Sequence, residues 1–125
     1  MRKIDLWTVK ALKNGEGVYS NDNTVVRIAP DGARIVELFG NKIFYINARG
    51  VVFFTLAGYN TVTTRARLNA ILSEYCMSIA TRGGVAYLFY NDELVTPLEN
   101  SGWIKVFPPV STNSMVHAEE VTRLD

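Results

Sequence analysis

The chain has 125 residues, 48% hydrophobic and 20% charged, which is the balance of one globular domain with a sizeable core and excludes a disordered chain. Thirteen Lys and Arg against twelve Asp and Glu give a formal net charge of +1, which argues against the overall basicity that nucleic-acid-binding modules often show. A single cysteine, Cys76, excludes an internal disulfide and a cysteine-based zinc cluster, and is typical of a reducing compartment.

The N-terminal segment predicts a short amphipathic helix. Ile4, Trp7, Ala11 and Leu12 recur at helical spacing, and Asn14-Gly15 follows as a stop signal, so we expect a helix over about residues 5–13 with Trp7 as its buried anchor. Charges spread through this start exclude a secretory signal, and no apolar run approaches the length that spans a membrane. The following "GEGVYSNDN" is rich in turn-forming residues and predicts a loop.

Four strand-like runs come next, at residues 24–29, 34–39, 42–47 and 51–56. The links between them, "PDG", "GN" and "NARG", contain Gly and Asn, which tolerate the positive φ of tight hairpins, so the strands must be antiparallel neighbours. The third and fourth runs, "KIFYIN" and "VVFFTL", are apolar on both alternating faces. We therefore expect both faces of this sheet to be covered, one by a helix and the other by C-terminal strands or a second copy of the chain.

The C-terminal third predicts further antiparallel strands and then a tail. "CMSIATRGGVAYLFYND" indicates a hairpin around residues 82–84, and "GWIKVF" a short closing strand. From residue 108 a polar run with two prolines indicates a tail that is disordered or carries one helical turn. The expected architecture is one α+β domain, residues 1–107, in which an antiparallel meander of about four strands packs against a central helix, followed by the tail, residues 108–125.

The central helix is predicted by "GYNTVTTRARLNAILSEY", Gly58 to Tyr75. Its apolar face is the series Thr64, Leu68, Ile71, Leu72 and Tyr75, at the spacing of a helix packed on a sheet. Thr61 or Thr63 is a natural N-cap. The positive end of the helix dipole disfavours cations, so the two arginines near this terminus need an offset.

Two offsets are open. In the structural alternative Arg65 reaches a carboxylate such as Glu37 or a strand carbonyl, Asn69 bonds to a neighbouring turn, and Arg67 projects from the more exposed flank. In the functional alternative backbone N–H groups, hydroxyls and guanidiniums converge on a phosphate or on a partner's carboxylate. The candidate binding residues for such an anion or partner are Thr61, Thr63, Thr64, Arg65, Arg67 and Asn69.

The run "GYNTVTTRARLNAIL", preceded by "FG" and "NKI", resembles the motif Gly-[Tyr/Trp]-x-Thr-x-Thr-Thr-Arg-x-Arg-Leu-Asn of a family of small tailed-bacteriophage proteins. The resemblance covers about Thr24 to Tyr90. It implies a protein of the cytoplasm of an infected bacterium, which is consistent with the cysteine usage. Such families lack assigned catalytic residues, and the resemblance implies binding to host machinery or defence systems.

The residues that most enzymes need are scarce in this sequence. The single histidine, His117, lies in the polar tail, and Cys76 at the start of a predicted strand is typical of a small buried hydrophobe. Without a second histidine we expect no metal site, and because "TRGGVAY" lacks the lysine of a phosphate-binding loop, we expect no cofactor. The sequence therefore predicts a protein that is not an enzyme.

The strands concentrate aromatic residues, namely Phe44, Tyr45, Phe53, Phe54, Tyr87, Phe89 and Tyr90. Core packing, a homodimer interface and base stacking each explain them. The expected function is a non-enzymatic phage protein that engages a host protein and inhibits or redirects it, in host takeover or counter-defence. The alternative is a single-stranded nucleic-acid-binding protein that uses the helix N-terminus and an aromatic sheet face.

Overall fold

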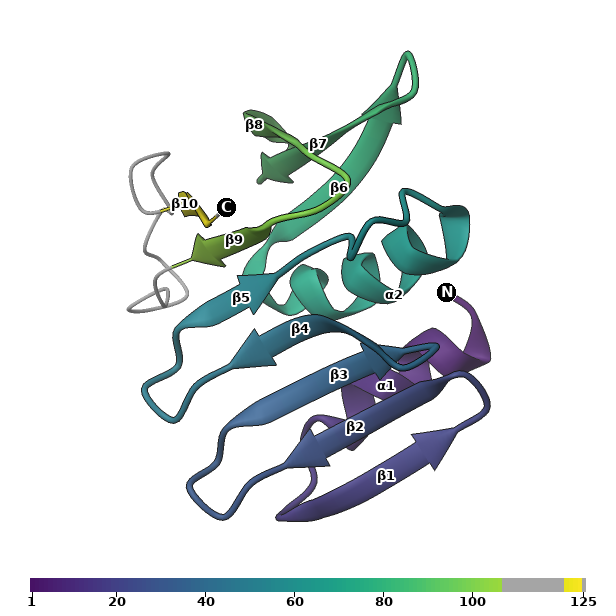
Figure 1. Ribbon diagram of the computed structural model, residues 1–125, viewed down its shortest axis with the longest axis vertical. Coiled ribbons are helices and arrows are strands. Elements are labelled where there is room, and N and C mark those ends of the chain that lie inside the picture. Colours follow the sequence, from purple (N-terminus) through teal and green to yellow (C-terminus); the bar gives the residue numbers. More distant parts are fainter. Residues whose placement is uncertain (107–120, 125) are drawn as a thin grey trace.

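The computed structural model describes residues 1–106 and 121–124, in which helices and antiparallel strands form two sheets (Figure 1). The elements are, in chain order, α1 (Lys3–Ala11), β1 (Gly17–Asn21), β2 (Thr24–Ile28), β3 (Arg34–Leu38), β4 (Asn41–Ile46), β5 (Val52–Phe54), α2 (Val62–Leu72), the 3-10 turn η1 (Ser73–Tyr75), β6 (Met77–Arg82), β7 (Val85–Tyr90), β8 (Glu93–Leu98), β9 (Trp103–Val106) and β10 (Val121–Leu124).

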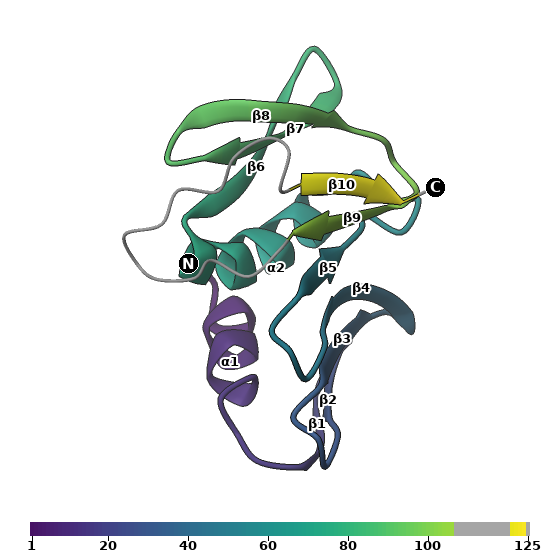
Figure 2. The same ribbon diagram turned by 90° about the vertical axis from the view of Figure 1, so that its left-hand side faces the viewer.

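The larger of the two sheets, called the large sheet below, has the order β1-β2-β3-β4-β5-β9-β10, and the small sheet has the order β6-β7-β8. Figures 1 and 2 show α1 and α2 side by side on one face of strands β1 to β5, with the small sheet next to α2. The predicted α+β fold, with an antiparallel meander packed on a central helix, is confirmed.

The core lies between the large sheet and the helices. Inward-facing Val36, Phe44 and Val52 of successive strands are buried against Leu68 and Ile71 of α2. A β-bulge opposite Val36 and Glu37 inserts Ile43, so that Ile43 and Phe44 are both buried although they are adjacent. This bulge explains part of the doubly apolar pattern that "KIFYIN" shows in the sequence.

Among the described residues, helices cover one face of the large sheet and C-terminal strands do not cover the other, while cover by a second copy of the chain stays a prediction. The other face of strands β2 to β5 and β9 carries half-exposed side chains such as Tyr45, Phe53 and Trp103, and no described element lies over it (Figure 2). We name this surface the open face. Within this single chain, Phe53 of "VVFFTL" is half-buried on the open face, whereas its neighbours Val52 and Phe54 are buried in the core.

Two segments that were not predicted as strands, Gly17–Asn21 and Glu93–Leu98, form strands β1 and β8. "GEGVYSNDN", predicted as a loop, contains β1, which pairs with β2 from Gly17↔Ile28 to Asn21↔Thr24. The turn formers Asn21 to Asn23 close this hairpin, with Asp22 at φ +51. Both β1 and β8, which holds Pro97, are edge strands, where polar residues and proline are tolerated.

Three further predictions concern Trp7, Cys76 and the C-terminal tail; the first two need correction, and the third falls partly on residues that the structure does not describe. Trp7 is half-buried, and the buried residues of α1 are Asp5, Thr8 and Ala11. Cys76 is exposed at φ +60 where η1 ends, so it is not the predicted buried hydrophobe. Of the predicted tail, residues 121–124 form β10 paired with β9, while residues 107–120, including His117, lie outside the described residues.

Candidate functional site

Thr61 is the N-cap of α2, one of the two residues predicted for this role. Its Oγ1 accepts a hydrogen bond from the backbone N–H of Thr64 at 3.2 Å, and the two hydroxyls lie 3.0 Å apart in a second hydrogen bond. Thr63 lies half-buried in the same turn. The hydroxyls of Thr61 and Thr64 therefore bond to one another and to the helix.

Arg65 is held by the residue that precedes the cap. Its Nη1 donates to the backbone carbonyl of Asn60 at 3.0 Å and to the side-chain Oδ1 of the same residue. The predicted Arg65–Glu37 pair is wrong, because Glu37 accepts from Arg27 at 2.5 Å on the open face, whereas α2 packs on the other one. The offset for this cation is local to the helix start.

Arg67 is the buried arginine of the helix, with 1% of its surface exposed. Its Nε donates to Oδ1 of Asp5 at 2.7 Å, and its Nη1 donates to the hydroxyl of Thr24 and, at 3.2 Å, to Oδ1 of Asn23. The predicted exposed position of Arg67 is therefore wrong. The residues that bury it belong to α1 and to the start of β2, which a wheel of α2 alone does not contain.

Asn69 joins α2 to the small sheet. Its Nδ2 donates to the carbonyl of Ile79 at 3.0 Å and its Oδ1 accepts from the N–H of Ile79 at 2.6 Å. Asn69 therefore bonds to strand β6 and not, as was predicted, to a neighbouring turn. The structure brings Thr61, Thr64 and Arg65 together at the start of α2, and places Arg67 and Asn69 in two separate structural contacts.

An open groove lies beside the start of α2, and we name it the helix-start groove. Its volume is about 320 Å³. Its floor is the buried set Leu38, Ile43 and Leu56. Phe39 and Tyr59 also line it and are 70% and 56% exposed, while Val62, next to lining residue Thr61, is 69% exposed. The full lining is Leu38, Phe39, Asn41, Ile43, Leu56, Ala57, Tyr59, Thr61 and Thr64.

Phe39 occupies a position that the backbone makes unfavourable. Leu38 pairs with Asn41, so Phe39 and Gly40 are the two residues of the β3–β4 turn, at φ +51 and +79. Two-residue hairpins with positive φ at both positions strongly favour Asn-Gly. A bulky residue held there stores strain of about 1 kcal/mol or more, and such strain marks functional segments. Here the ring gains little burial in return.

A second left-handed turn carries Tyr59. Ala57 and Gly58 have φ of +55 and +86, and the N–H of Tyr59 donates to the carbonyl of Leu56 at 2.9 Å. Two strained turns, 20 positions apart in the sequence, thus hold an aromatic side chain each around one groove. Both "FG" and "GY" occur in or beside the motif, but neither was predicted to belong to the binding site. The signal was a phenylalanine where a hairpin turn prefers asparagine.

The protein family described as Kyanoviridae Gp96 protein matches residues 1–105. The chain belongs to this family. It is therefore a phage-encoded protein, which confirms the phage origin implied by the resemblance. None of the curated proteins and none of the solved structures matches the chain. The residues that the Gp96 family matches include the whole helix-start groove.

A cleft of about 470 Å³ lies between the ends of both helices and the large sheet of this Gp96-family chain. Lys13 and Glu74 line it and form an ion pair of 3.1 Å, while Arg34 donates to the carbonyl of Leu12 at 2.6 Å and so caps the end of α1. Burial raises the pKa of Tyr75 in this cleft, with the Glu74 carboxylate adding to the rise and Arg34 opposing it. These contacts tie the helices to the sheet and give the cleft a structural role.

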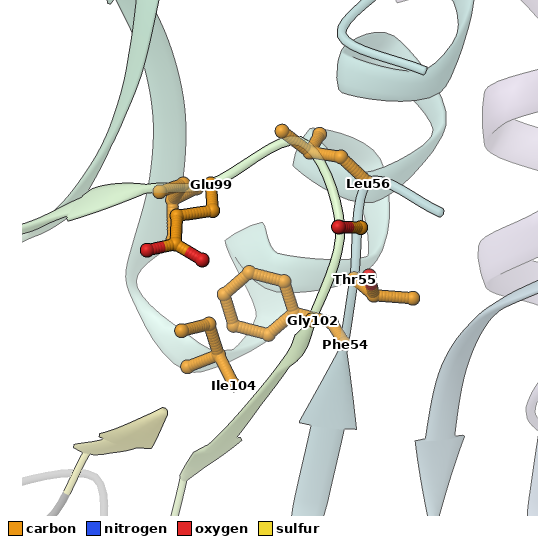
Figure 3. A pocket seen from close by; sticks show the side chains of 8 residues that line it. Phe54, Thr55, Leu56, Glu99, Gly102 and Ile104 are labelled. Atoms are coloured by element: carbon orange, nitrogen blue, oxygen red, sulfur yellow. The ribbon is translucent and has the colours of Figure 1, made fainter. Parts of the chain in front are cut away.

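A second hollow, between β5 and the β8–β9 connection, is far smaller (Figure 3). Its volume is about 10 Å³, with Phe54 and Ile104 among the lining side chains. Such a space holds about one water molecule. It is a packing defect between strands and is too small for a ligand.

Among residues 1–106 and 121–124, neither helix has the length and apolar character needed to cross a bilayer.

The helix-start groove is the feature of the described chain that combines exposed aromatic residues, an apolar floor and backbone strain.

Proposed function

We propose that this phage protein is a non-enzymatic binding protein that engages a host protein and inhibits or redirects it, in the cytoplasm of the infected bacterium. The helix-start groove is the proposed contact. The observation that carries the proposal is Phe39, an aromatic residue held 70% exposed at φ +51 where asparagine would be less strained.

Shape and apolar character of the groove support a protein partner. Exposed Phe39 and Tyr59 line the groove together with a buried apolar floor, and aromatic residues around a pocket are typical of the anchors of protein interfaces. The volume of about 320 Å³ accommodates one or two side chains of a partner. An apolar side chain of the host protein enters between the rings of Phe39 and Tyr59.

The positive charge at the start of α2 indicates which residue of the partner lies next to that apolar side chain. The first turn contains no acidic residue, and Arg65 adds a positive charge to the positive end of the helix dipole. A carboxylate of the partner would complement this end. The partner segment therefore pairs an apolar side chain with an adjacent Asp or Glu.

The lining of the groove supports the non-enzymatic part of the proposal. The nine residues of the groove named above include no acid, histidine or cysteine. The hydroxyls of Thr61 and Thr64 bond to one another, so neither is paired with a general base that would activate it. The groove offers apolar contact and a positive helix end, which serve binding.

Affinity capture from lysate of the host tests this proposal. The tagged full chain is compared with Phe39→Asn, Tyr59→Ser and the matched control Leu94→Ser, which removes a 57% exposed leucine from β8. Each sample is captured with and without nuclease treatment. We expect wild type and Leu94→Ser to capture the same protein, and both groove variants to lose it without a fall in melting temperature.

Two results would count against the groove. Equal capture by Phe39→Asn and wild type would show that the partner binds elsewhere. Capture that disappears with nuclease in the wild-type sample would show that nucleic acid carried the contact.

A further inference from the structure

A row of side chains crosses the open face of the large sheet. The strand register aligns Ile35 with Tyr45, Tyr45 with Phe53, and Phe53 with Lys105. All four belong to the face opposite the helices, because their sequence neighbours Val36, Phe44, Phe54 and Ile104 are buried in the core. The row therefore consists of three neighbouring apolar or aromatic residues and ends in a lysine.

The two aromatic residues of this row lie against one another. The ring centroids of Tyr45 and Phe53 are 5.6 Å apart, with an interplanar angle of 37°. Trp103 lies beside them in the lining of a shallow hollow of about 340 Å³, together with Ile35 and Lys42. The hollow has room for a planar ring between the protein side chains.

The charges around the row are mainly positive. Lys42 lines the hollow, and Nζ of Lys105 lies 5.8 Å from the centroid of the Phe53 ring. Glu37, the acid on this face of β3, is held by Arg27 at 2.5 Å. The aromatic platform therefore has a lysine on each of two sides, and its acid is already neutralised.

We propose that the open face binds single-stranded nucleic acid, with bases stacked on Tyr45 and Phe53 and with Lys42 and Lys105 at the phosphates. Planar bases joined by anionic phosphates match a platform of aromatic residues flanked by lysines. A second copy of the chain fits this surface less well, because a two-fold contact would gather the lysines of both copies around it.

This site is separate from the helix-start groove and goes beyond the proposed function. The helices pack on the opposite face of the large sheet (Figure 2). The helix N-terminus and the aromatic face, which the sequence analysis combined for a nucleic-acid ligand, therefore do not form one continuous surface. Loss of one site leaves the other intact, so the two proposals fail independently.

Fluorescence anisotropy with a labelled oligothymidine of about 12 nucleotides tests the site, because such strands match the span of known single-strand platforms. We expect Phe53→Ala to weaken binding by roughly 5- to 150-fold, the value of one stacked base. We also expect Lys105→Glu to weaken it and to reduce the salt dependence. Phe53→Leu keeps apolar bulk without a ring and decides the matter if Phe53→Ala does not fold.

The matched control is Lys3→Glu, the same change of charge on α1, on the other side of the sheet. We expect Lys3→Glu to bind nearly as wild type does, and an abasic strand of equal length to bind far more weakly than oligothymidine. Absence of binding at low salt, equal effects of Lys3→Glu and Lys105→Glu, or equal affinity for the abasic strand would each overturn the proposal. A wild-type dimer that Phe53→Ala converts to a monomer would assign the face to a second copy instead.

Discussion

Arg67 connects three elements that are distant in the sequence, since its partners Asp5 and Thr24 lie 62 and 43 positions away. Asp5 is 3% exposed and also accepts from Nε of Arg2 at 3.2 Å. A buried carboxylate and guanidinium that satisfy one another fix the packing of α1 on α2 more than they add net stability. We call this contact the structural clasp. The sequence indicated only that an arginine near the start of α2 needs a compensating partner, and not which residues provide it.

Removal of this clasp from one side gives a prediction. Arg67→Ala leaves the Asp5 carboxylate buried without its main partner, so we expect a loss of about 3–5 kcal/mol in the free energy of unfolding. Arg65→Ala, which breaks bonds to the neighbouring Asn60, is expected to cost about 1 kcal/mol. Urea denaturation at neutral pH measures both.

The double variant Asp5→Leu, Arg67→Met is the control for this prediction. It removes both charges and keeps apolar volume, so we expect it to be far more stable than Arg67→Ala. Similar losses for Arg65→Ala and Arg67→Ala would contradict the assignment of Arg67 as the buried residue.

The same arginines show what residue patterns alone resolve. The wheel of α2 identified Thr64, Leu68, Ile71 and Leu72, which are all buried, because a sheet covers that face. It misplaced Arg67 because α1 buries a second face, and no local pattern of α2 records the position of a helix more than 50 residues earlier. Thr61 as N-cap was predictable because capping is a local contact.

At the scale of elements, hairpins were predictable wherever glycine marked a two-residue or short turn. "GN" after Phe39 and "GG" before Val85 both close hairpins of the structure. β1 was missed because its turn formers outnumber its apolar residues, which an edge strand allows. The helix-start groove was missed because Phe39 and Tyr59 meet only when β3–β4 packs beside the start of α2.

The β3–β4 turn carries a prediction of its own. Asparagine tolerates positive φ better than phenylalanine, so we expect Phe39→Asn to raise the free energy of unfolding by about 0.5–2 kcal/mol. Phe39→Ala removes the ring but keeps the unfavourable backbone, and we expect a smaller gain from it. Thermal and urea unfolding of the three proteins provide the comparison.

The sign of this change distinguishes strain from packing. A more stable Phe39→Asn that has lost its partner would mean that stability is given up for binding at this turn. A clear loss of stability in both variants would instead mean that the Phe39 ring stabilises the fold, and would remove the main support for the proposed contact.

At the scale of the whole molecule, the large sheet separates two surfaces of different chemistry. On the helix side, strained turns and the positive end of α2 surround an apolar groove. On the open face, aromatic residues and lysines lie side by side around a shallow hollow. The sequence pattern located the aromatic residues in strands but could not predict the surface that they form together. This surface is completed by β9, which pairs with β5 although Ile104 lies 50 positions after its partner Phe54.

Hydrogen–deuterium exchange on the complex with the captured host protein tests the central claim most directly, because it reports which segments the partner covers. We predict slower exchange at residues 39–41 and 57–62, the two turns and the start of α2 that surround the helix-start groove. Unchanged exchange in these segments, with protection confined to other parts of the chain, would contradict the claim that the groove binds the host protein.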